Sequence, residues 1–138
     1  MERSGEKRGI SYGVSEFGQL LGRLVERVPG AEAAVLSDRR GDAIDFAHLP
    51  NRTRAIDVQI AGAQVGQAMS RLRIASILHG LGQPVVLIEC AHAKLVAAPL
   101  DNEFLLTLAL SEHASLARAL VEVRDLRPSL RNLLSCDL

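Results

Sequence analysis

The sequence predicts an α/β domain of the α+β type, in which helices flank one five-stranded antiparallel sheet in the order α-β-β-α-β-β-β-α. Three observations lead to this fold class. Apolar residues recur at helical spacing in three stretches, five short apolar stretches are bounded by glycine, proline or polar residues, and the loops between consecutive strands are short. The length of 138 residues fits one domain, since domains most often have about 100–150 residues.

Residues 1–14 are expected to form a flexible N-terminal tail. They carry glycines at positions 5, 9 and 13 and show no apolar periodicity, so they have little surface to bury. From Ser15 to Val28, apolar residues recur every three or four positions, which predicts a helix with one buried face. Pro29 and Gly30 end this helix.

A β-hairpin is expected next, with strands at residues 33–37 and 42–47. The Asp-Arg-Arg-Gly sequence at positions 38–41 has the composition of a tight turn, with Gly41 where a positive φ is needed. Asp38 and Asp42 flank the turn and could be read as paired carboxylates for acid–base chemistry. Aspartate beside glycine is what turn geometry itself favours, so we interpret both as turn residues.

A long helix is expected from Ala55 to Leu78. This stretch contains no proline, and its apolar residues lie on more than one side of the helix. Such a helix is expected to be buried twice, once on its own sheet and once on another surface.

Three strands and a last helix complete the domain. Apolar stretches at 85–88, 95–98 and 104–110 predict an antiparallel meander. Ser111 is the expected N-cap of the last helix, and Pro128 is expected to end it. We therefore divide the chain into three units: the tail 1–14, a domain at 15–126, and a C-terminal helical extension or tail at 127–138.

The charge balance excludes two classes of partner. Sixteen Lys and Arg residues balance sixteen Asp and Glu residues, so the net charge is zero. Without excess positive charge the chain lacks the field that attracts nucleic acid or an anionic membrane, and we expect neither partner. No stretch has the roughly 18 apolar residues of a membrane-spanning helix, and no signal peptide is recognisable at the start. We expect a cytoplasmic protein.

No catalytic residue, metal site or cofactor is expected. Zinc ligands are possible at His79, Cys90 and His92, but no fourth ligand and no paired spacing accompany them. We interpret His79 as a helix-end residue and Cys90 as a core thiol. The chain also lacks a glycine-rich loop ending in Gly-Lys-Ser/Thr, so it is not itself a GTPase. We therefore predict that the protein is not an enzyme.

The long helix and the strand after it are expected to form a dimer interface. Each glycine inside a helix costs about 1 kcal/mol relative to alanine, and the close approach of a second backbone would explain both Gly62 and Gly66. The alternative is that these glycines let the helix lie close to its own sheet. The strand at 85–88 is apolar on both faces and is either an edge strand that another chain covers or an interior strand. The predicted interface residues are Val58, Gly62, Val65, Gly66, Met69, Val86 and Ile88.

Three segments, together with the element order, resemble a known family. They are Val28-Pro29-Gly30-Ala31, Leu36-Ser37-Asp38-Arg39-Arg40-Gly41-Asp42-Ala43-Ile44 and Lys94-Leu95-Val96-Ala97-Ala98-Pro99-Leu100. Residues 15–126 resemble the Roadblock family of dynein light chains and their bacterial relatives. Profilin and longin domains share much of the element order. The chain departs from the family pattern at residues 90–93, where no glycine stands between the third and fourth strands, and beyond Leu126, where the tail is longer.

The resemblance implies a function. It implies homodimers or heterodimers joined through the long helix and the edge strand after it, and bacterial members that regulate or dock small Ras-like GTPases. Arg52, Arg54 and Asp57, at the start of the long helix, are candidates for binding such a partner, although charged residues there also suit a solvated surface. The alternatives are a small-ligand sensor and a structural scaffold subunit of a larger assembly.

Overall fold

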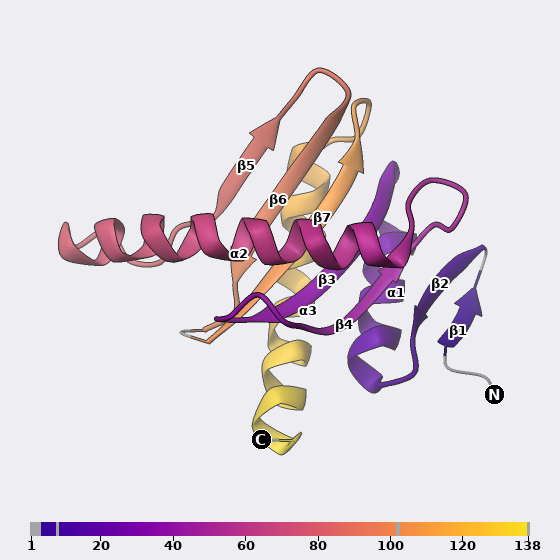
Figure 1. The fold of residues 1–138 in the computed structure, drawn as a ribbon, viewed down its shortest axis with the longest axis horizontal. Helices are drawn as coiled ribbons and strands as arrows, with labels where there is room; N and C mark the ends of the chain where they lie inside the picture. Colours follow the sequence, from indigo (N-terminus) through magenta and orange to yellow (C-terminus); the bar gives the residue numbers. More distant parts are fainter. Residues whose placement is uncertain (1–3, 8, 102, 138) are drawn as a thin grey trace.

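The computed structural model of the protein describes residues 4–7, 9–101 and 103–137. Together these residues form seven strands and three helices (Figure 1). In chain order the elements are β1 (Ser4–Lys7), β2 (Ile10–Gly13), α1 (Glu16–Arg27), β3 (Ala31–Asp38), β4 (Ala43–His48), α2 (Ala55–Leu78), β5 (Val86–Glu89), β6 (Ala93–Pro99), β7 (Phe104–Ser111) and α3 (Leu116–Asp137).

All seven strands belong to one antiparallel sheet with the order β1-β2-β4-β3-β7-β6-β5. The predicted fold class, an antiparallel sheet with flanking helices, is confirmed. The predicted number of five strands is wrong, because β1 and β2 precede α1 and extend the sheet beyond β4. The element order therefore differs from the prediction by two strands at its start.

The helices cover the two faces of the sheet unequally. In Figure 1, α2 crosses one face, whereas α1 and α3 lie on the other. The main core lies between the sheet and the pair α1 and α3, and its largest fully buried side chains are Leu21, Leu24, Leu36, Leu100, Leu106, Leu108, Leu110 and Leu130. Only two small clusters of buried side chains lie on the α2 side in the described part of the chain. The face under α2 is therefore the less completely packed of the two.

The N-terminal hairpin contradicts the expectation of a flexible tail over residues 1–14. Ile10 of β2 is only 4% exposed and joins the main core, and the Tyr12 ring lies against Gly22 of α1. Backbone pairing of β2 with β4 adds to this burial. The expectation is wrong because α1 and β4 supply apolar surface that residues 1–14 lack on their own. Residues 1–3 and 8 lie outside the described part of the chain.

A buried carboxylate joins β2, α1 and β4. Asp45 of β4 is 8% exposed, accepts the hydroxyl hydrogen bond of Ser15 and accepts the Phe46 backbone N–H at 2.9 Å. Gly13 and Gly18 border this carboxylate so closely that a Cβ on either would overlap it, and a Cβ on Gly18 would also overlap the Gly13 carbonyl oxygen. The junction therefore has room only for glycine at both positions.

The β3–β4 turn has the predicted geometry. Gly41 has a φ of 90°, and Oδ1 of Asp38 accepts the backbone N–H groups of Arg40 and Asp42 at 2.9 and 3.0 Å. The Asp38 carboxylate thus stabilises the turn, as expected for aspartate at this position.

The last helix differs from its prediction at both ends. Ser111 ends β7, and α3 begins at Leu116, where Oγ of Ser115 accepts the backbone N–H of Arg118 at 3.1 Å. Pro128 lies inside α3 and does not end it. Beyond this proline, Leu130 and Leu134 are buried in the main core, and this burial offsets the hydrogen bond that proline removes.

The boundaries of α2 are those predicted, Ala55 to Leu78, and His79 is its C-cap residue. Apolar side chains lie all around this helix, yet only one side contacts the sheet. Within the described residues, neither α2 nor any other helix is long and apolar enough to cross a membrane.

Candidate functional site

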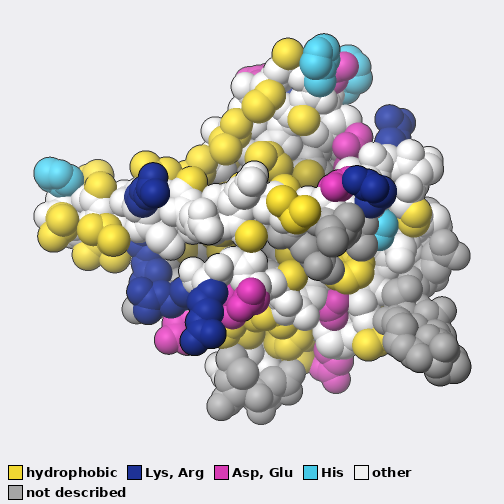
Figure 2. Space-filling view, viewed as in Figure 1, with side chains coloured by type: hydrophobic (Ala, Val, Ile, Leu, Met, Phe, Trp, Pro, Cys, Tyr) yellow, Lys and Arg dark blue, Asp and Glu magenta, His cyan; other side chains and the backbone are white. Residues whose placement is uncertain are grey.

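Exposed apolar side chains concentrate at one end of the molecule. Eight of the twelve exposed large hydrophobic side chains among the described residues lie between Leu72 and Ile88. We call this set the α2–β5 surface, and it consists of Leu72, Ile74, Ile77, Leu78, Leu81, Val85, Leu87 and Ile88. Figure 2 shows hydrophobic side chains gathered over the free end of α2 and along β5. Monomeric proteins rarely expose so many large apolar side chains in one place, and such a concentration is typical of an interaction surface.

The surface exists because α2 extends beyond β5, the last strand on that side of the sheet. In Figure 1 the C-terminal part of α2 projects past β5 into solvent. Met69 is the last buried apolar side chain of the helix, at 6% exposed, whereas Ile77 and Leu78 are 51% and 79% exposed. Exposed apolar side chains at a projecting helix end are typical of an interaction surface.

The second part of the surface is an open sheet edge. Among the described residues, β5 is the last strand on its side of the sheet and pairs only with β6, which confirms the edge position considered from the sequence. Ile88 pairs with Leu95, which pairs with Ala109, so these three side chains form a row on the α2 face beyond the helix. An exposed apolar edge of this kind is a template for pairing with another chain.

Most of the predicted interface residues of α2 lie against their own sheet. A Cβ on Gly62 would meet Val35 of β3 at 2.7 Å, and a Cβ on Gly66 would lie 3.8 Å from Cα of Gly41 in the β3–β4 turn. Val65 and Met69 pack in the small cluster under α2. The close approach that explains Gly62 is therefore the alternative one, between the helix and its own sheet, whereas Gly66 leaves room for a Cβ.

The remaining predicted interface residues have different positions. Val86 is half-buried beside Met69, and Ile88 is 37% exposed on the edge strand. Val58 belongs to α2, but its side chain lies outside the described part of the structure. Sequence reasoning missed the exposed residues of the overhang. The available signal was the apolar residues that continue from the end of α2 through the loop to β5.

The two glycines of α2 provide a matched pair of substitutions. Gly62→Ala is expected to destabilise the fold by about 1–3 kcal/mol because its Cβ would press on Val35. Gly66→Ala is expected to stabilise it by about 0.5–1 kcal/mol, since the new Cβ makes an ordinary contact and alanine favours the helix. Urea unfolding of both variants measures the difference. Equal changes in the free energy of unfolding of the two variants would contradict the placement of Gly62 against β3.

Arg52, Arg54 and Asp57 lie at the start of α2, at the opposite end from the overhang. All three are exposed. Arg54 donates to Asp57 from Nε at 2.9 Å and from a terminal nitrogen at 3.2 Å, and this hydrogen-bonded carboxylate raises the pKa of Arg54. Two of the three candidate partner-binding residues therefore pair with each other.

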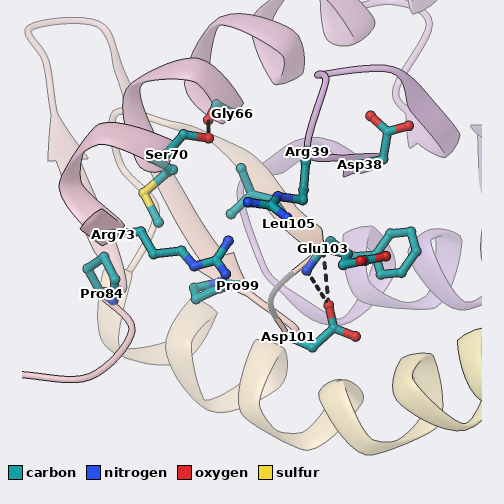
Figure 3. Close-up of a pocket in the computed structure, with 12 residues that line it drawn as sticks. Asp38, Arg39, Gly66, Ser70, Arg73, Pro84, Pro99, Asp101, Glu103 and Leu105 are labelled. Atoms are coloured by element: carbon teal, nitrogen blue, oxygen red, sulfur yellow. Dashed lines mark hydrogen bonds between the residues drawn. The ribbon is translucent and has the colours of Figure 1, made fainter. Parts of the chain in front are cut away.

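A small pocket lies under α2 beside the β3–β4 turn (Figure 3). Arg39 and Arg73 point into it, and the β6–β7 turn with Asp101 and Glu103 forms its other side. Its volume is about 30 Å³, which accommodates one or two water molecules. Ligand sites usually have about 300–1,000 Å³, so this pocket is too small for a small-molecule ligand.

The residues considered as metal ligands do not gather in one place. His79 ends α2, whereas Cys90 and His92 lie at the exposed β5–β6 turn, so Cys90 is not the core thiol expected. Among the described residues, no three His, Cys, Asp or Glu side chains are placed to hold a metal ion.

Comparisons with known proteins identify the fold. No protein-family model and no curated protein matches the sequence. A Roadblock/LC7 domain from Streptomyces avermitilis is similar over 88% of this chain and 99% of its own length, with 24% identity and a TM-score of 0.77. Myxococcus xanthus MglB is similar over 88% of this chain and 99% of its own, with 18% identity and a TM-score of 0.76.

A further solved structure, an MglB with a tetrameric arrangement, is similar over 87% of this chain and 88% of its own, with 16% identity and a TM-score of 0.78. The three similarities extend over nearly the whole length of those proteins. They agree with the resemblance noted in the sequence over residues 15–126. The chain therefore has the Roadblock/LC7 fold.

Proposed function

We propose that the protein is a non-catalytic, dimeric interaction protein that binds a small Ras-like GTPase and regulates or positions it. The observation that carries the proposal is the α2–β5 surface, an exposed apolar helix end next to an open sheet edge. The Roadblock/LC7 fold supports the choice of partner, since bacterial members of the Roadblock family regulate or dock such GTPases. We retain the cytoplasmic location as part of this proposal.

The occupant of the α2–β5 surface in this proposal is a second copy of the chain. Two β5 strands that pair across a two-fold axis would satisfy the open backbone groups of both edges. The same axis would place the projecting end of each α2 over the row of Ile88, Leu95 and Ala109 on the partner's sheet. One of the similar proteins, an MglB, has a tetrameric arrangement, which is consistent with self-association.

The proposed dimer revises the interface expected from the sequence. Ile77, Leu78 and Leu87 replace Gly62, Gly66 and Met69 as its main contacts, because the first three are exposed and the others are buried against the chain's own sheet. Val86 and Ile88 keep their predicted place at the edge strand.

A small-ligand sensor is the less favoured alternative. The pocket under α2 has only about 30 Å³. The larger hollow next to Phe17, Ile44 and Leu134, of about 500 Å³, is an open surface groove with Arg39 and Arg40 in its lining.

A scaffold role in a larger assembly would use the same α2–β5 surface. It differs from the proposed function only in which partner the dimer binds.

Binding to a GTPase tests the functional part of the proposal. The full chain should bind a Ras-like GTPase encoded beside its own gene, with different affinities for the GDP-loaded form and for the form loaded with a non-hydrolysable GTP analogue. Single-turnover GTP hydrolysis with and without the protein then separates regulation from positioning. Absence of binding in both nucleotide states would contradict the proposed partner but would not contradict the proposed dimer.

A further inference from the structure

Three arginines form a stripe along one side of α3. Arg124, Arg127 and Arg131 are spaced by three and four residues, which places them next to each other on a helix. Arg124 and Arg131 are exposed and Arg127 is half-buried. Because α3 lies behind the sheet, on the face opposite α2 (Figure 1), this arginine stripe is separate from the α2–β5 surface.

The acidic residues of α3 do not neutralise the stripe. Glu122 pairs with Arg118, with Nε and Oε2 3.3 Å apart, and Glu122 and Asp125 both line the groove between α3 and α1. Among the described residues, neither Arg124 nor Arg127 has an ion-pair partner. The helix thus separates its charges into an acidic side facing α1 and a basic side facing away from it.

The nearest turn also leaves the stripe without a carboxylate. Arg131 donates from Nε to the Leu100 carbonyl oxygen at 2.8 Å, which fixes this side chain next to the β6–β7 turn. In that turn Oδ1 of Asp101 accepts the backbone N–H groups of Glu103 and Phe104 at 2.7 and 3.1 Å. One oxygen of the Asp101 carboxylate is therefore engaged within its own turn, and among the described residues neither Asp101 nor Glu103 forms an ion pair with the stripe.

Arg127 is the centre of the stripe and the least satisfied of its members. Its Nε is buried and has no hydrogen-bond partner among the described residues. Burial lowers the pKa of Arg127, and repulsion by Arg131 and Arg124 lowers it further. A buried guanidinium nitrogen between two like charges is unfavourable in the isolated chain, and an anion bound to the exposed guanidinium groups of the stripe would offset the repulsion.

We propose that the arginine stripe Arg124, Arg127 and Arg131 is a docking site for an acidic segment of a partner protein, with carboxylates of that segment binding the guanidinium groups. Guanidinium groups bind carboxylates through paired hydrogen bonds, which a lysine stripe would not provide. This proposal does not depend on the identity of the GTPase or on the dimer.

Charge and surroundings favour a protein partner over the other anions. Nucleic acid binding depends on a broad positive field, whereas this chain has a net charge of zero and acidic residues on the side of the same helix that faces α1. A membrane surface would call for several exposed apolar residues beside the basic ones. On α3 the described part of the chain offers only Val121 as an exposed large apolar side chain.

The test uses the full chain labelled with ¹⁵N on arginine and observes the Nε–H resonances during titration with a ten-residue glutamate peptide. We expect the resonances of Arg124 and Arg127 to shift most. The double variant Arg124→Gln/Arg127→Gln should bind the peptide about tenfold more weakly, as for the loss of two charge pairs. The matched control Arg23→Gln/Arg27→Gln removes the same net charge from α1 and should change binding less than about twofold.

The thermal stability of an Arg127→Gln variant distinguishes a docking role of this arginine from a structural role. Arg127→Gln should leave the thermal midpoint unchanged or raise it, because it removes a repelled charge, whereas an arginine needed for folding would lower it. Equal weakening by the two double variants, or tighter binding of a ten-nucleotide single-stranded DNA or of phosphatidylserine vesicles than of the glutamate peptide, would overturn the proposal.

Discussion

Gly18→Ala will lower the free energy of unfolding by about 3 kcal/mol, the upper end of the usual cost of overpacking a core. The added Cβ would lie 2.9 Å from Oδ2 of Asp45 and would overlap the carbonyl oxygen of Gly13. That carbonyl belongs to the backbone, so it moves only if β2 leaves α1. At an exposed helical glycine the same substitution would instead raise the free energy of unfolding by about 1 kcal/mol. The sign of the change therefore distinguishes a tightly packed Gly18 from an exposed one.

Urea unfolding of Gly18→Ala measures this loss, with Gly22→Ala as the control in the same helix. A Cβ on Gly22 would meet the ring of Tyr12 at 3.1 Å, and because that ring can turn aside, we expect a change of less than about 1 kcal/mol. A Gly18→Ala protein as stable as the unmodified one would show that the N-terminal hairpin is not docked on α1 and β4.

Ile77→Glu/Leu78→Glu will raise the dissociation constant of the dimer by about a thousandfold or more, which corresponds to about 4 kcal/mol. Both side chains lie on the projecting end of α2, 51% and 79% exposed, and in the proposed dimer the partner's sheet covers them. Burying two unpaired carboxylates in an apolar interface is unfavourable enough for an effect of this size. Sedimentation velocity over a range of concentrations measures the change.

The same two substitutions should leave the folded chain intact, because exposed positions without special contacts usually change stability by less than about 0.5 kcal/mol. Val121→Glu is the matched control, since Val121 is 49% exposed and belongs to α3, outside the α2–β5 surface. The control should remain dimeric. Dimers of unchanged affinity in the Ile77→Glu/Leu78→Glu variant would exclude the end of α2 from the interface.

The elements that the sequence predicted well are those with strong local signals. The boundaries of α2 agree with the predicted range, and Gly41 has the positive φ that its turn requires. The helix α1 begins next to Ser15, where the predicted helical pattern begins, and Oγ of Ser15 accepts the Gly18 N–H at 3.3 Å. Each of these features depends on a few neighbouring residues, so it can be read without knowing the tertiary fold.

The missed elements depend on contacts between distant parts of the chain. The N-terminal hairpin is ordered by α1 and β4, so the alternation of Ile10 and Tyr12 with Ser11 and Gly13 was too short to predict it alone. Pro128 was expected to end α3, but the burial of Leu130 in the main core extends the helix beyond it. In both regions tertiary burial outweighs the local preference.

The interface prediction shows a similar limit. The sequence indicated that α2 has apolar residues on more than one side, but it did not show which side rests on the sheet. Gly62 and Met69 could therefore be assigned to either surface, and the structure places them against the sheet. The overhang of Ile77 and Leu78 depends on where the sheet ends under the helix, which only the assembled fold determines.

Self-association is the central claim, and the solution mass of the full chain tests it most directly. Light scattering after size-exclusion chromatography should be measured over a wide range of protein concentrations. We predict a mass of twice that of one chain at high concentration, falling toward that of one chain for Ile77→Glu/Leu78→Glu and staying doubled for Val121→Glu. A mass equal to that of one chain at every concentration would contradict the proposed dimer and the function built on it.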